Sequence, residues 1–301
     1  MTEIGNLAGA VASGDFVVTA QCRPPRGGDV DRLKKCAADL RGVVHAISAP
    51  ESEDGPRQSS LAACAHLADA GVEPILHLLT RDMNRIALQS AILGAASMGV
   101  RNVLCLSGRH QTLTTSSSAR GVFDIDPIQL LRVADGMRKE GRLADGQTMD
   151  SPIELFLGTD TNPFADLVDL QLVTLQKAVS AGVDFVITQP VFDMERFGAW
   201  MSAVREHELH DRTCIIAGLL PLTSREQAAS LMGKYRSLMI PDSILDLLEG
   251  SSSPRASGIK IAVENLERLR DMDGVRGVHL MTGEDFELAK EILSASVVAR
   301  S

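Results

Sequence analysis

The chain has 301 residues, of which 45% are hydrophobic and 23% are charged, so it can bury a large core. Its net charge of -9 and its pI near 5.3 argue against nucleic acid as the main partner, because phosphate binding needs clustered lysines and arginines. No segment approaches the roughly 18 consecutive apolar residues of a membrane span, and the chain does not start with a basic flank and an apolar stretch, so we expect a cytoplasmic protein.

Short runs rich in valine, isoleucine and leucine recur along the chain and predict eight buried strands. They occupy residues 16–21, 43–48, 73–79, 102–107, 153–158, 185–189, 214–220 and 277–282. Segments with the apolar spacing of helices lie between them, at 31–40, 58–70, 84–98, 127–139, 165–180, 195–205 and 224–269. Because apolar strands alternate with amphipathic helices, we expect a parallel sheet that the helices cover.

Eight strand and helix units predict an α/β fold, the (β/α)8 TIM barrel, as one domain over residues 1–301. The extra helices before the last strand then form a local insertion. An open doubly wound sheet is the alternative, but it would normally carry a glycine-rich nucleotide turn, and neither GxGxxG nor GxxxxGK[ST] occurs. The polar loops at 112–120 and 251–254 are too short to separate domains.

Metal and hydrolytic sites are not indicated. The five cysteines are scattered without a CxxC pair, which argues against a disulfide framework and a zinc knuckle. His207 and His210 lie in a charged stretch that is more typical of a solvated helix end than of a metal site. GxSxG and HExxH motifs are absent from the sequence. We therefore expect no metal ion.

In a TIM barrel the loops at the carboxyl ends of the strands build the active site. One strand, in GVDFVITQPVFD, ends in Gln189 directly before Pro190. The amide of Gln189 either caps its strand or reaches into a binding site, since it offers both a donor and an acceptor. The other strand ends are mostly polar or glycine, and this mixture suits binding of a flat heterocycle or cofactor.

Several segments, in this order along the chain, resemble the methylenetetrahydrofolate reductases. They are RPPRG, RDMNRIALQSAILGAASMGVRNVLCLSG, GTDTNPFAD and AGVDFVITQPVFD. The resemblance covers nearly the whole chain and is closest to the short bacterial enzymes of the acetogen type. It implies a flavin, FAD or FMN, at the carboxyl face of the barrel and reduction of methylene-tetrahydrofolate to methyl-tetrahydrofolate. It also implies a separate redox subunit as electron donor, and the aliphatic helices make self-association plausible.

The resemblance assigns roles to individual residues. It implies that Gln189 hydrogen-bonds the folate pterin, with Gln21 and Arg109 in the same folate site. For the flavin it implies eight positions: Ser48, His77, Ser107, Gly108, Gly158, Asn162, Ala165 and Lys177. Gly108 has an alternative interpretation as an ordinary loop glycine, and Lys177 as a lysine on a helix surface.

Two departures from the family pattern lie at acidic positions. Gln21 occupies the place of a glutamate that acts as general acid, and an amide cannot supply a proton in that way. Arg109 replaces the aspartate that follows the glycine of the strand-four motif, so the local charge is reversed. A cation beside the flavin would raise its reduction potential and make it a weaker donor.

Three interpretations of these departures stay open. In the first, another group replaces the missing acid, namely Asp124, Asp160, His110 or a water, and Gln21 positions the substrate. The catalytic candidates are then Gln21, Arg109 and Asp124. Alternatively, the protein is a flavin-independent, tetrahydrofolate-dependent methyltransferase in which Arg109 pairs with an anionic methyl donor or acceptor. Third, it is a noncatalytic folate-binding subunit.

Overall fold

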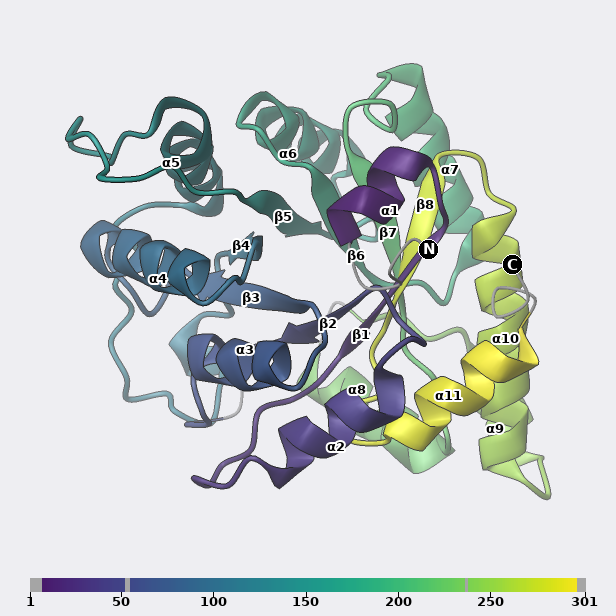
Figure 1. The fold of residues 1–301 in the computed structure, drawn as a ribbon. Coiled ribbons are helices and arrows are strands. Elements are labelled where there is room, and N and C mark those ends of the chain that lie inside the picture. The colour runs from purple at the N-terminus through teal and green to yellow at the C-terminus, as the bar shows by residue number, and fades with distance from the viewer. Residues whose placement is uncertain (1–6, 52–54, 236–237, 297–301) are drawn as a thin grey trace.

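The computed structural model describes residues 7–51, 55–235 and 238–296, and these form a closed barrel of parallel strands in chain order (Figure 1). The strands are β1 (Val17–Gln21), β2 (Ala46–Ala49), β3 (Pro74–Leu79), β4 (Asn102–Leu106), β5 (Phe156–Thr161), β6 (Phe185–Pro190), β7 (Cys214–Leu219) and β8 (Val275–Leu280). The barrel closes where β8 pairs with β1. The predicted TIM barrel is thus confirmed.

Helices surround the barrel in the order expected for this fold (Figure 1). One helix follows each of the first six strands: α2 (Asp31–Leu40), α3 (Ser60–Asp69), α4 (Arg85–Ser97), α5 (Pro127–Glu140), α6 (Val168–Ser180) and α7 (Met194–Glu206). A short 3-10 helix, η1 (Gln111–Leu113), lies between β4 and α5. Local caps set several starts: Asp126 and Gln129 form a capping box at α5, and Asn84 accepts two backbone N–H groups at α4.

The predicted insertion before the last strand is present, but the single helical region expected at 224–269 is three helices. They are α8 (Arg225–Lys234), α9 (Asp242–Glu249) and α10 (Pro254–Arg270). Proline explains two of the helix starts, because Pro241 precedes α9 and Pro254 is the first residue of α10. Sequence reasoning missed two helices, α1 (Leu7–Ser13) and α11 (Phe286–Ala295).

Strand β5 begins and ends three residues later than predicted. Its ladder starts at Phe156, whose N–H donates to the carbonyl of Arg101, whereas the carbonyl of Leu155 accepts from the side chain of Arg138. Gly158 and Asp160 therefore lie within the strand rather than after it. This shift changes what surrounds Gly158, as the site geometry shows.

The core has two layers. Strand residues facing outward pack with the helices in one large cluster that contains Val18, Ile47 and Leu76. Residues facing inward, including Val17 and Phe185, fill the barrel together with Leu7 of α1. Helix α1 lies across the end of the barrel at which the strands begin (Figure 1). Within the described residues, no helix is long and apolar enough to cross a membrane.

Candidate active site at the barrel mouth

Three polar side chains share the rim of the barrel mouth because strand side chains alternate in direction. Val17 faces the interior and Val18 faces the helices, so Gln21 at the end of β1 faces inward. By the same alternation from inward-facing Phe156 on β5 and Phe185 on β6, two further residues face the mouth. These are Asp160 and Gln189.

Gln189 uses its side chain toward the mouth rather than as a strand cap. Its Nε2 donates to Oδ2 of Asp160 on the neighbouring strand over 3.5 Å. The neighbouring residue Thr188 connects the end of β6 to β7 instead. Its hydroxyl donates to the carbonyl of Gln189 and accepts from the N–H of Gly218 on β7. A register irregularity between Ile187 and Pro190 accompanies this turn. The amide of Gln189 is therefore presented beside a carboxylate.

A buried polar cluster lies below the rim, inside the barrel. Nδ1 of His279 on β8 lies 2.8 Å from Oγ1 of Thr19, and its Nε2 lies 3.4 Å from Oγ of Ser48. Nε2 of His77 is buried and has no hydrogen-bond partner among the described residues. Sequence reasoning missed Thr19 and His279, although the alternation along β1 and β8 could have found them.

Burial keeps both histidines of this cluster neutral. It lowers the pKa of His77 to about 3, with His279 as a second cause, because the low-dielectric interior disfavours the charged form. Burial also lowers the pKa of His279 to about 4. At neutral pH the cluster therefore offers neutral donors and acceptors, not positive charge.

Inside the barrel, two of the positions predicted to contact a flavin are already engaged. Ser48 is fully buried and its hydroxyl faces His279. Gly158 lies opposite Phe185, and a Cβ at Gly158 would sit 2.3 Å from Cζ of that ring. The glycine therefore makes room for a phenylalanine of the barrel interior, so its backbone is covered on this side.

The remaining predicted flavin positions are spread over the molecule. Oδ1 of Asn162 accepts from the N–H of Phe164, and the N–H of Ala165 donates to the carbonyl of Asn162. Lys177 is exposed in the last turn of α6, where the chain returns toward the start of β6, away from the mouth. Ser107 and Gly108 follow β4, Asn162 directly follows β5, and the buried His77 lies on β3, so these four positions stay at or just below the rim.

Gly108 lies in the loop directly after β4. Its φ is +79°, a left-handed conformation that favours glycine, and a Cβ there would lie 3.3 Å from Cβ of Arg81 and from Cδ1 of Leu79. Protein atoms rather than open space thus face it. Three of the eight predicted positions, Ser48, Gly158 and Lys177, are thus sealed inside the barrel or lie away from the mouth, and these three do not fit a flavin there. The proposed function assigns no step to a flavin.

Two of the candidate replacements for the missing acid have close partners of their own. Asp124 accepts from Nε and Nη2 of Arg85 over 2.8 and 3.0 Å. These hydrogen bonds lower the pKa of Asp124 to about 2, so it stays ionised at neutral pH. His110 stacks on Phe123 with ring centroids 6.3 Å apart, and its Nδ1 lies 2.8 Å from Oγ1 of Thr112.

Arg109 links the loop after β4 to the inserted helices. Its Nη2 donates to the carbonyl of Lys234 over 2.9 Å, and its Cζ lies 4.9 Å from the ring centroid of Tyr235. Its own carbonyl accepts from Nη1 of Arg81 over 2.9 Å. Sequence reasoning did not single out Lys234 or Tyr235, the one tyrosine of the chain, because nothing local connects them to Arg109.

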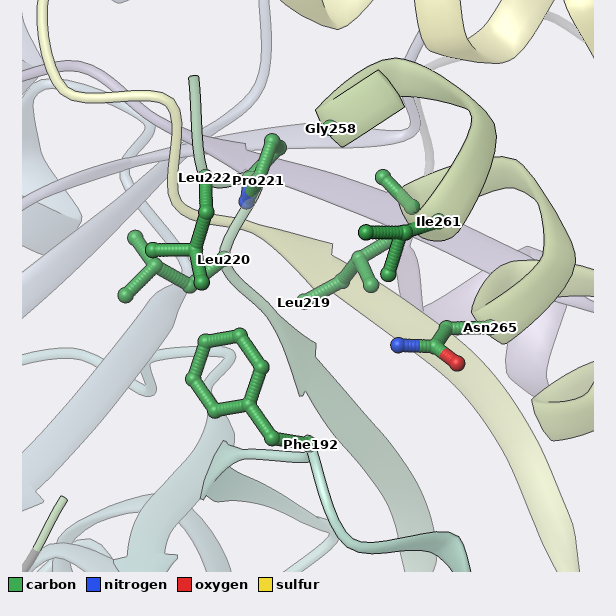
Figure 2. A pocket seen from close by; sticks show the side chains of 9 residues that line it. Phe192, Leu219, Leu220, Pro221, Leu222, Gly258, Ile261 and Asn265 are labelled. Carbon is green, nitrogen blue, oxygen red and sulfur yellow. The ribbon is translucent and has the colours of Figure 1, made fainter. Parts of the chain in front are cut away.

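A small cavity, about 10 Å³, lies between the loop after β7 and α10 (Figure 2). Phe192 and four consecutive residues, Leu219 to Leu222, line it together with the amide of Asn265. This volume is enough for about one water molecule. A Cβ at Gly258 would lie 1.7 Å from the carbonyl oxygen of Leu222, so α10 packs directly on this loop. The packing fixes the chain that leads into α8.

A larger cavity, about 480 Å³, is lined by residues of α1 and of the starts of β4 and β5. It therefore lies at the opposite end of the barrel from the rim residues. Among the described residues, no group of three or more histidine, cysteine, aspartate or glutamate side chains could hold a metal ion.

The comparison that decides the family spans almost the whole barrel. The sequence profile of the methylenetetrahydrofolate reductases matches residues 7–297. The chain belongs to this family. A methylenetetrahydrofolate reductase of Escherichia coli is 21% identical over 300 residues, which are 95% of this chain and 93% of that protein.

Longer members of the methylenetetrahydrofolate reductase family also match. A "probable methylenetetrahydrofolate reductase (NADPH)" of Caenorhabditis elegans is 26% identical over 255 residues, which are 83% of this chain but 36% of that protein. Methylenetetrahydrofolate reductase 2 of Saccharomyces cerevisiae is 32% identical over 220 residues, 70% of this chain and 34% of that protein. The chain thus spans about a third of the length of these eukaryotic relatives.

Among solved structures, a Clostridium thermocellum protein has a similar fold. It superposes with a TM-score of 0.70 at 13% identity and covers 98% of this chain and 100% of its own. It is described as an uncharacterised protein that binds two copies of 5-methyl-5,6,7,8-tetrahydrofolic acid. At this identity the likeness establishes the barrel fold of the reductase-family chain and nothing further.

Proposed function

We propose that the chain binds a reduced folate at the barrel mouth and reduces methylene-tetrahydrofolate to methyl-tetrahydrofolate. The observation that carries the proposal is the contact between Gln189 and Asp160 on the rim, with Gln21 facing the same mouth. Family membership supports the choice of reaction, and the E. coli relative that aligns over almost its full length carries that name.

The rim suits the edge of a pterin, which alternates hydrogen-bond donors and acceptors. The amide of Gln189 supplies both, and the carboxylate of Asp160 supplies acceptors beside it. Gln21 adds a second amide from β1. Together these groups recognise a flat ring by its edge, while the partnerless Nε2 of His77 stays buried in the cluster below.

The reaction needs a proton as well as a hydride. The hydride adds to the methylene carbon, the bond between that carbon and N10 breaks, and N10 gains a proton. We assign the proton to Asp160 in its protonated form, which takes its proton from solvent before each turnover and ends the step as the carboxylate. Asp160 is the carboxyl group that contacts Gln189 on the rim, whereas Arg85 holds Asp124 ionised. In this assignment Gln21 positions the substrate and does not transfer a proton.

The hydride donor is a separate question. Three of the predicted flavin positions, Ser48, Gly158 and Lys177, do not fit a flavin at the mouth, and a flavin stays a prediction that an absorption spectrum of the purified protein checks. The redox subunit and self-association also stay predictions. A hydride donor offered in solution, a reduced flavin or a dihydronicotinamide, tests turnover directly.

Methyl transfer is the second candidate, and the observation that favours it is Arg109. A guanidinium at the mouth in place of an acid suits an anionic methyl donor or acceptor. The solved relative that is described as binding methyl-tetrahydrofolate supports a folate at this fold, but not one reaction over the other.

The experiment measures binding and turnover together. Calorimetry with methyl-tetrahydrofolate should give saturable binding. Gln189→Ala should weaken this binding about tenfold, because the variant loses the hydrogen bonds between the neutral amide and the pterin edge. Anaerobic incubation of methylene-tetrahydrofolate with each hydride donor should then form methyl-tetrahydrofolate. Folate binding without product would support the noncatalytic subunit, and release of the methyl group to an acceptor would support methyl transfer. Absence of any folate binding would overturn the proposal.

A further inference from the structure

The guanidinium of Arg109 has hydrogen-bonding capacity that the protein does not use. Its Nη2 is engaged with the carbonyl of Lys234, but its Nη1 is buried and has no partner among the described residues. Among the described residues, no carboxylate pairs with the guanidinium of Arg109. Arg109 as a whole is half-buried, but a buried N–H donor of a cation that is left without a partner is costly, so this arrangement favours an anionic ligand that reaches Nη1.

Several contacts hold the guanidinium in place before any ligand arrives. The backbone carbonyl of Arg109 accepts from Arg81, and the preceding residue, Gly108, has a left-handed φ of +79°. On the other side, Nζ of Lys234 lies 5.0 Å from the centroid of the Tyr235 ring on which Arg109 also rests. Two cations therefore flank one aromatic ring, and the side chain of Arg109 is oriented by it.

The position of the Arg109 guanidinium relative to the rim determines which part of a bound ligand it would contact. Arg109 follows β4, and Lys234 ends α8, which follows β7. Strands β5 and β6 lie between β4 and β7 in the barrel and carry Asp160 and Gln189. A ligand held at one end by Gln189 can therefore extend its other end toward Arg109.

We propose that Arg109, with Lys234 and Tyr235, forms a subsite for the carboxylates of the glutamate tail of a folate. The proposal rests on the proposed folate site and adds the group that reads the acidic end of the substrate. A guanidinium pairs with a carboxylate through parallel charge-assisted hydrogen bonds, and the partnerless Nη1 is available for such a pair. The substitution of an acid by Arg109 then has a positive role in substrate selection.

The test compares two ligands that differ only in the tail. Dissociation constants of 5-methyl-tetrahydrofolate and of 5-methyl-tetrahydropteroate, which lacks the glutamate, are measured by calorimetry. Wild-type protein should bind the glutamate-bearing ligand at least tenfold more tightly, and Arg109→Gln should bring that ratio close to one. Arg101→Gln removes a positive charge near the opposite end of the barrel, beside Glu154, and should leave the ratio unchanged.

A second pair of variants keeps the test valid if Arg109→Gln does not fold. Tyr235→Phe preserves the ring under Arg109 and should keep the ratio, whereas Tyr235→Leu should lower it. A wild-type ratio near one, or an unchanged ratio in Arg109→Gln, would overturn the subsite. Binding of adenosine diphosphate is measured in parallel as a phosphate-bearing probe. If Arg109→Gln loses affinity for adenosine diphosphate but keeps the preference for the glutamate-bearing folate, the anion at Arg109 is a phosphate, and the subsite for the glutamate tail is overturned. If the wild type binds neither pterin ligand, the folate site fails instead.

Discussion

The side-chain amide of Gln189 on β6 contacts the carboxylate of Asp160 on β5, 3.5 Å away on the rim of the barrel mouth. The two residues are 29 positions apart in the chain, yet their strands are paired, with Thr161 opposite Thr188. Because Asp160 contacts Gln189, it is the carboxyl group whose substitution tests proton transfer most directly.

Asp160→Asn should lower kcat by about a hundredfold or more, the usual contribution of a positioned general acid. The dissociation constant of methyl-tetrahydrofolate should change much less, because an amide still accepts a hydrogen bond from Gln189. Asp124→Asn is the matched control, since Asp124 is bound to Arg85, and its kcat should stay within about threefold of wild type. A large loss in the control with none in Asp160→Asn would assign the acid to Asp124.

Gln21→Glu should reduce turnover if Gln21 positions the substrate. The new carboxylate would stand at the same mouth as Asp160 and would lose the donor group of the amide. We expect kcat/KM to fall about tenfold at neutral pH, measured as methyl-tetrahydrofolate formation. A rise in activity would instead identify Gln21 as a disabled general acid.

Gly158→Ala should destabilise the barrel, because the added methyl group would lie 2.3 Å from the Phe185 ring. Overpacking of this kind typically costs about 1–3 kcal/mol in the free energy of unfolding. Replacing Phe185 by leucine in the same chain should recover part of that loss, and urea unfolding of the four proteins in the cycle measures the coupling. Additive losses would mean that Gly158 does not serve to accommodate the ring.

The two buried histidines should make the protein less stable in mild acid. Below about pH 6.5, the unfolded chain binds protons at His77 and His279, whereas the folded chain resists protonation until their pKa values of about 3 and about 4. Stability therefore falls as the pH falls through this window, by about 2 kcal/mol for each histidine at pH 5. His77→Gln should show a smaller difference in unfolding free energy between pH 7 and pH 5 than wild type does.

The barrel and the rim were predictable because both depend on local periodicity. Alternating apolar strands and helices fixed the architecture, and strand ends identified Gln21, Asp160 and Gln189 as candidates for the mouth. Helix α1 was missed because seven residues carry too little pattern, and the start of β5 was missed because apolar residues precede its ladder.

The partners of the candidate residues were not predictable from the sequence. Arg85 lies 39 residues from Asp124, Ser48 lies 231 residues from His279, and Lys234 lies 125 residues from Arg109. Such contacts follow from barrel closure and from the inserted helices, not from neighbouring residues. They decide which candidate is ionised, which is sealed in the core and which remains available to a ligand.

The stacked rings of Phe156 and Phe185, 5.2 Å apart between centroids, form a floor beneath the buried histidines. Because these rings and Leu7 of α1 fill the barrel interior on that side, we expect folate and hydride donor both to approach from the mouth. A folate and a hydride donor that share one entrance either bind there together, face to face, or bind one after the other. Initial-rate patterns separate these cases, since intersecting lines belong to a ternary complex and parallel lines to alternation.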